Sequence, residues 1–122
     1  MKKLTKAEEE VMQVIWQRER CLVSDILADL KDDKGKKPPH STISSIVRIL
    51  ERKGFVDHKA YGRTYEYFPI VSKEEYSQRS VKGLVRDYFD GSMQNLVSFL
   101  VKEEDLSADD LRDLLRRLED SE

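Results

Sequence analysis

The sequence has one cysteine and no long apolar run. A single cysteine excludes an intrachain disulfide and a cysteine metal cluster, and it fits a reducing cytoplasm. No apolar run approaches the roughly 18 residues that a membrane span needs, and the N-terminus lacks the apolar core of a signal peptide. We therefore expect a cytoplasmic protein with no membrane association.

The motifs of the common enzyme classes are also missing. The sequence contains no P-loop, no dinucleotide-binding glycine motif and no nucleophile elbow. His40 and His58 are far apart, and neither belongs to a metal-ligand spacing. We therefore expect a protein that is not an enzyme, with no metal and no other cofactor. Cys21, in the turn after the first helix, is interpreted as a small apolar core residue.

Charge is close to balanced overall but unevenly distributed. The net charge is -2, which by itself argues against a nucleic-acid binder. Residues 1–69 hold 14 Lys or Arg and 11 Asp or Glu, whereas residues 70–122 hold 8 and 13. Residues 31–63 alone hold 9 basic and 4 acidic side chains. A local basic region beside an acidic one favours binding of nucleic acid by that region.

Two helices are predicted before the basic region. The first begins at Thr5, because Thr5 and Glu8 have the spacing of a capping box. A broad apolar stripe at helical spacing predicts burial on more than one side of it. The stripe consists of Ala7, Val11, Met12, Val14, Ile15 and Trp16. Ser24 is predicted to cap a short second helix, and the lysine-rich residues 31–39 are predicted to form a loop.

A third helix, predicted from His40 or Ser41 to just before Gly54, has two contrasting faces. The apolar face carries Ile43, Ile46, Val47 and Leu50. The opposite face carries Ser41, Ser44, Ser45, Arg48 and Arg52, with Thr42 at its edge. Ser and Thr are mediocre helix formers, but their small hydroxyls permit close approach to a groove and hydrogen bonds to bases and phosphates. The alternative is an ordinary amphipathic helix with a solvated face.

The apolar pattern changes from helical spacing to alternation after Gly54. Residues 55–59 and 64–68 flank Gly62, which predicts a β-hairpin that ends at Pro69. Helix, helix, basic helix and hairpin is the order of a winged helix. Cationic and small residues around the third helix and the hairpin are predicted to contact phosphates. These are His40, which could instead cap the helix, and Lys36, Lys37, Lys59, Gly62 and Arg63.

The last third is predicted to be helical and to need a partner. Ser72 and Glu75 have capping-box spacing, and residues 90–92 interrupt the helix. Three short amphipathic helices bury little by themselves, so a second copy of the chain is the simplest partner. The candidate dimerisation residues are Leu84, Tyr88, Leu96, Leu100, Leu111, Leu114, Leu115 and Leu118. Folding back onto the N-terminal part is the alternative.

These patterns predict a mainly α fold with a small β-hairpin. Residues 1–71 are expected to form a winged helix-turn-helix that binds DNA, and residues 72–122 a helical dimerisation domain. Two other functions are compatible with the same fold. One is a winged-helix regulator that leaves DNA when a small effector binds between its domains. The other is a protein-interaction module that does not use DNA.

The sequence resembles the penicillinase and methicillin-resistance repressors (BlaI/MecI type) from Leu4 to about Leu118. The resemblance is carried by LTKAEEEVMQVIW, STISSIVRILERKGFVDHK, GRTYEYFPIVSKEEY and GSMQNLVSFLVKEEDLS. Such proteins are homodimers that repress antibiotic-resistance genes and are inactivated by proteolysis after a membrane sensor detects the drug. The resemblance therefore implies double-stranded operator DNA, a second copy of the chain and a sensor-linked protease as partners.

Site residues follow from the resemblance as well. Thr42, Ser44 and Ser45 occupy positions used for groove contact, and Gly62 with Arg63 occupies the wing.

Two positions depart from the family's pattern. Ile49 stands where an arginine is common. The bond that the family cleaves, usually between Asn and Phe, aligns with Phe99-Leu100.

Overall fold

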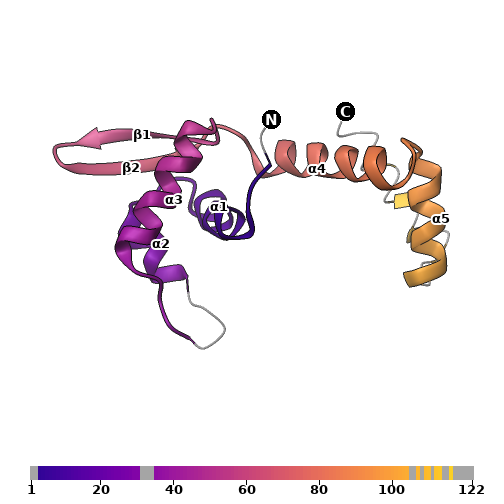
Figure 1. Cartoon of the computed structure of the whole chain (residues 1–122), viewed down its shortest axis with the longest axis horizontal. Coiled ribbons are helices and arrows are strands. Elements are labelled where there is room, and N and C mark those ends of the chain that lie inside the picture. The colour runs from indigo at the N-terminus through magenta and orange to yellow at the C-terminus, as the bar shows by residue number, and fades with distance from the viewer. Residues whose placement is uncertain are drawn as a thin grey trace. The chain divides into compact units, whose positions relative to one another are not determined.

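The structure is a computed structural model that describes residues 3–30, 35–104, 107, 109–110, 112–113 and 116. The chain divides into two compact units, residues 1–72 and residues 73–122. In Figure 1 the first runs from indigo to magenta and the second begins with α4. Among the described residues, the structure has no helix with the length and apolar character that crossing a membrane requires.

The first unit has three helices followed by a β-hairpin (Figure 1). The elements are α1 (Lys6–Arg18), α2 (Val23–Asp29), α3 (His40–Arg52), β1 (Val56–Tyr61) and β2 (Thr64–Pro69). The two strands are antiparallel, and their pairing runs from Tyr61 opposite Thr64 to Val56 opposite Pro69. This is the order of elements in a winged helix, as the sequence predicts.

The turn after α1 adds a third backbone segment to the hairpin. The N–H of Cys21 donates to the carbonyl of Tyr67 at 3.0 Å, and the N–H of Tyr67 donates to the carbonyl of Cys21 at 2.7 Å. Burial raises the pKa of the Cys21 thiol to about 11. The interpretation of Cys21 as a core residue is therefore confirmed, whereas its backbone pairing with β2 was not predicted.

The core of this unit is formed by the inward faces of its helices and by the start of β1. Its fully buried side chains include Val11, Met12, Ile15, Ile26, Ile43, Val47, Leu50 and Phe55. Burial of each such side chain contributes about 1.5–3 kcal/mol. One predicted member of the α1 stripe is wrong, because Ala7 is exposed and its neighbour Glu8 is buried instead. A charged residue therefore occupies the edge of the core.

Helix α3 ends in a Schellman motif. The N–H of Phe55 donates to the carbonyl of Leu50, and the N–H of Gly54 donates to the carbonyl of Glu51, both at 3.0 Å. Gly54 has φ of 84°, a conformation that other residues rarely adopt. This turn reverses the chain directly from the third helix into β1.

Helix α2 does not begin as predicted. It starts at Val23, one residue before the expected cap Ser24. The Asp25 carboxylate accepts the backbone N–H of Leu22 at 2.9 Å, so Asp25 rather than Ser24 satisfies a backbone group at this end. The prediction failed because the N-cap is Leu22, which lacks the side-chain acceptor by which a helix start is usually recognised, while Asp25 is the third helical residue.

The second unit contains α4 (Lys73–Tyr88) and α5 (Met93–Glu104). Asp90 and Gly91 both have positive φ, which ends α4, and Ser92 Oγ accepts the N–H of Asn95 at 3.2 Å at the start of α5. Val85 and Leu96 are buried. Four predicted dimerisation residues lie outside the described residues, namely Leu111, Leu114, Leu115 and Leu118.

Candidate nucleic-acid interface

Helix α3 buries one face and exposes the opposite one. Ile43, Val47 and Leu50 are fully buried. The exposed residues of the helix are His40, Ser41, Thr42, Ser45, Arg48 and Arg52. Ser44, Ile46 and Ile49 are half-buried along the flanks. The predicted division into an apolar and a hydroxyl-and-arginine face is therefore present, although Ser44 and Ile46 lie at its borders.

The start of α3 carries small polar side chains and no carboxylate in its first turn. Pro39 is the N-cap, and its carbonyl accepts the N–H groups of Thr42 and Ile43. His40 is the first helical residue and not the cap, so the capping role considered for it is wrong. Its ring lies 3.4 Å from Ser44 Oγ. The positive end of the helix dipole favours anions such as phosphate at this position.

The tip of the hairpin is a two-residue turn. Gly62 has φ of 64°, and glycine at the first central position is typical of a type II′ turn, which matches the twist of the strands. Arg63 is exposed beside it. Lys59 Nζ lies 5.5 Å above the ring of Tyr61, whose side chain is 52% exposed. Tyr61 was not predicted as a member of this surface, although alternation along β1 places it on the same face as Lys59.

Lys36 and Lys37 are exposed and are separated from the first residue of α3 by Pro38 and Pro39. Figure 1 shows this segment at the N-terminal end of α3, while the hairpin extends from the opposite end. The predicted DNA-contacting residues therefore lie on one helix face and on the two segments that adjoin its ends.

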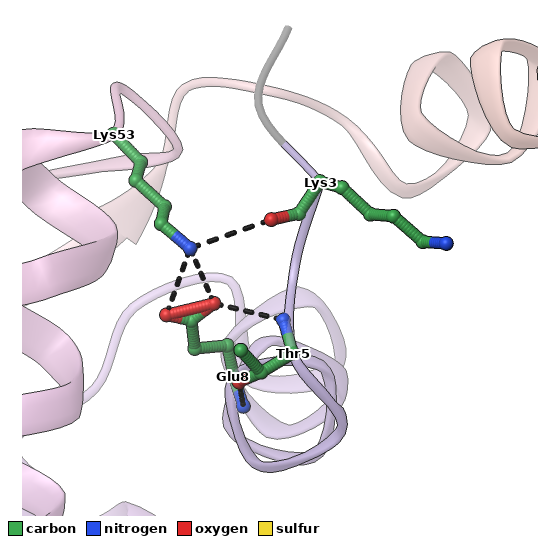
Figure 2. Close-up of polar contacts among 4 residues, drawn as sticks. All are labelled: Lys3, Thr5, Glu8 and Lys53. Carbon is green, nitrogen blue, oxygen red and sulfur yellow. Dashed lines mark hydrogen bonds and ion pairs between the residues drawn. The ribbon is translucent and has the colours of Figure 1, made fainter.

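An ion pair fixes the C-terminal end of α3 to α1 (Figure 2). Lys53 Nζ lies 2.6 and 3.0 Å from the two carboxylate oxygens of Glu8 and 3.4 Å from the carbonyl of Lys3. Glu8 also completes the predicted capping box with Thr5. Burial raises the pKa of the Glu8 carboxyl, but the hydrogen bonds from Lys53 and from the Thr5 N–H outweigh it, so the pKa is lowered.

A second contact joins α1 to the end of the hairpin. Trp16 Nε1 donates to the carbonyl of Val71 at 2.9 Å. Together with the Glu8–Lys53 pair, this bond holds α1 against both α3 and the segment that follows β2. Such fixed support keeps an exposed helix face in one orientation, which recognition of a groove requires.

Fold and exposed surface together define a winged-helix DNA-binding protein. The model of the penicillinase repressor family matches residues 4–120, and the chain belongs to that family. It is similar to the methicillin resistance regulatory protein MecI of Staphylococcus aureus (strain N315), with 28% identity over 111 residues, 91% of this chain and 89% of MecI. It is also similar to the penicillinase repressor of Bacillus licheniformis, with 25% identity over 117 residues, 96% of this chain and 90% of that protein.

Solved structures agree with this assignment. The solution structure of the DNA-binding domain of the repressor BlaI has a TM-score of 0.51 and 29% identity, and the match covers 62% of this chain and 94% of that domain. A complex structure of hsRosR-S1 has a TM-score of 0.52 at 21% identity, covers 94% of this chain and 88% of that one, and supports the fold alone. The chain is therefore a DNA-binding repressor and not an enzyme.

Proposed function

We propose that the chain is a homodimeric transcriptional repressor that binds a palindromic operator and is relieved by proteolysis. The observation that carries the proposal is the exposed face of α3, where Ser41, Thr42 and Ser45 precede Arg48 and Arg52. Small hydroxyls followed by arginines allow a helix to enter the major groove and to contact both base edges and phosphates.

Roles within this surface follow from position. Thr42, Ser44, Ser45 and Arg48 are proposed to read bases. The remaining residues lie elsewhere on α3, in the segment before it or at the tip of the hairpin, and are proposed to contact the DNA backbone. They are His40, Ser41, Arg52, Gly62, Arg63, Lys36 and Lys37.

Dimerisation is proposed to occur through the second unit. Leu84 and Tyr88 are 44% and 75% exposed on α4, and Phe99 is exposed on α5. Exposed large apolar side chains on so small a unit favour contact with a second copy. Leu96 is already buried within its own chain and Leu100 is half-buried, so these two offer less surface to a partner than Leu84 and Tyr88.

The regulated genes are proposed to be resistance genes, as the name of the methicillin resistance regulatory protein MecI states for that protein. Phe99-Leu100 lies inside α5, and the Phe99 ring packs near Phe89, with 5.5 Å between ring centroids. A protease needs extended backbone, so cleavage here requires local opening of α5. The cut would separate residues 100–122 from the DNA-binding unit and weaken the dimer.

Footprinting on the promoter region of the protein's own gene, combined with sedimentation, tests the proposal. The expected result is a protected site with two-fold symmetry and a dimer at micromolar concentration. Protection of no site would refute DNA-based repression. Release of DNA by a small molecule, with the chain intact, would replace the proteolytic route by an effector-based one.

A further inference from the structure

The surface assigned to DNA contains two carboxylates that DNA binding does not explain. Between residues 35 and 63 the sequence has seven Lys or Arg and two acidic residues, Glu51 and Asp57. Both belong to one cluster with His58, in which one ligand atom from each residue lies within 4.8 Å of the other two. Carboxylates repel phosphates, so contact with the DNA backbone does not account for these two.

The cluster joins two elements of the winged helix. Glu51 lies in the last turn of α3, and Asp57 and His58 lie in β1, so the turn at Gly54 brings them together. His58 Nδ1 is hydrogen-bonded to the Glu51 carboxylate. Asp57 Oδ1 accepts the backbone N–H of His58 at 2.8 Å. The two ligand-bearing segments are therefore already close, and binding an ion here needs little rearrangement of the backbone.

The imidazole is also held in a defined plane. The ring of Tyr65 stacks on His58, with 4.2 Å between centroids and 22° between planes. The side chains of His58 and Glu51 are 28% and 34% exposed, which leaves them accessible to solvent. Imidazole nitrogen and carboxylate oxygen are both ligands of zinc in proteins, and a ligating imidazole is usually held in one orientation by its neighbours.

We propose that Glu51, Asp57 and His58 bind one divalent transition-metal ion of the zinc class. One imidazole nitrogen and two carboxylate oxygens form a donor set that suits Zn²⁺ or Mn²⁺, whereas Mg²⁺ and Ca²⁺ prefer oxygen ligands alone. Three protein ligands leave a further position for water. The carbonyl end of the α3 dipole adds a favourable field for a cation.

The ion has a consequence for DNA binding, and this step rests on the proposed function. It neutralises the charge of Glu51, which lies within one helical turn of Arg48 and Arg52, together with that of Asp57 in β1, and it ties α3 to β1. Less repulsion of phosphate and a more rigid wing both favour the DNA-bound state. Metal-loaded protein is therefore expected to bind operator DNA more tightly than metal-free protein.

Titration of chelator-treated full chain with Zn²⁺, by calorimetry and without DNA, tests the site directly. Co²⁺ absorption gives an independent signal for the ligand set. The expected result is one ion per chain with micromolar or tighter affinity. His58→Ala and Asp57→Asn are expected to lower that affinity at least about tenfold. His40→Ala is the matched control, because His40 lies on α3 outside the cluster, and it is expected to leave the affinity unchanged.

Thermal denaturation in chelator shows whether each variant folds, and added Zn²⁺ is expected to raise the midpoint of wild type but not of His58→Ala. Absence of saturable binding, or unchanged affinity in folded His58→Ala and Asp57→Asn, would overturn the site. If the ion binds but operator affinity does not rise, the link to DNA is wrong. Failure of DNA binding itself would appear in the footprint and leave the metal titration unaffected.

Discussion

Replacing Lys53 by methionine removes the ion pair that fixes α3 to α1 and so measures its contribution to stability (Figure 2). Lys53→Met keeps most of the aliphatic stem and removes the ammonium group. Glu8 is 5% exposed, so the substitution leaves its carboxylate nearly buried and without its cation. The capping-box bonds to Thr5 remain.

The expected cost can be bounded from the burial of the two partners. Removing one partner of a fully buried ion pair costs about 3–5 kcal/mol. The Lys53 side chain retains 20% exposure, so water replaces part of the lost interaction. We therefore expect a loss of about 2–3 kcal/mol at neutral pH. For a unit of this size, that loss lowers the melting midpoint by about 10–20 °C.

Urea denaturation followed by the fluorescence of Trp16, the single tryptophan, reports on the first unit. The pKa of Glu8 is lowered from 4.5 in the folded wild type, so its stabilising contribution is present above the unfolded pKa. That contribution is lost as the pH falls through the folded pKa. In Lys53→Met the burial of Glu8 is no longer opposed by the charge of Lys53, so it favours the protonated form of the Glu8 carboxyl. The difference in free energy of unfolding between the two proteins should therefore shrink as the pH falls toward and through the ordinary carboxyl pKa of 4.5.

Lys37→Ala serves as the control, because Lys37 is exposed, and its stability is expected to match that of wild type. A loss below about 1 kcal/mol in Lys53→Met, the range of surface pairs, would show that Glu8 is effectively solvated. A stability gap that stays constant from neutral to acidic pH would contradict the assignment of the cost to a charged Glu8.

Three further predictions concern DNA and assembly. Arg63→Ala should weaken binding to operator and random DNA equally and lower the log–log salt slope by about one unit; a changed sequence preference at constant slope would make the wing a base reader. Arg48→Ala should cost about 1–3 kcal/mol at the operator and little on random DNA in anisotropy titrations; equal losses would argue against base readout. A chain ending at Phe99 should sediment as a monomer and bind the operator at least about tenfold more weakly; repression in cells at the full-length level would refute the dimer mechanism.

Features set by short spacings were predictable from the sequence. The Thr5–Glu8 capping box, the two faces of α3 and the glycine turn at Gly62 depend on neighbours within one or two turns of chain. The start of α2 was mispredicted because its N-cap is Leu22, which has no capping side chain, whereas the neighbouring Ser24 matches the usual preference for an N-cap. The type of a secondary-structure element is therefore easier to predict from local sequence than the residue at which the element begins.

Contacts between distant segments could not be predicted from spacing. Glu8 and Lys53 are 45 positions apart, and a charge at position 8 gives no signal of burial until its partner is known. The backbone pairing of Cys21 with Tyr67 also arises only when the hairpin packs against the helices. The apolar stripes likewise did not predict which residues are buried within a single chain and which stay exposed. Val85 is buried and Leu84 is exposed, although both belong to the same stripe.

The buried thiol has a practical consequence for both redox chemistry and labelling. With a pKa of about 11, Cys21 exists as thiolate in only about one molecule in 10⁴ at neutral pH. Its sulfur is also shielded from reagents by the surrounding core. Peroxide and maleimides should therefore leave Cys21 unmodified in the native protein. The affinity for DNA should accordingly be the same under oxidising and reducing conditions. A cysteine introduced at an exposed position would carry a fluorophore at that single place, without removal of Cys21.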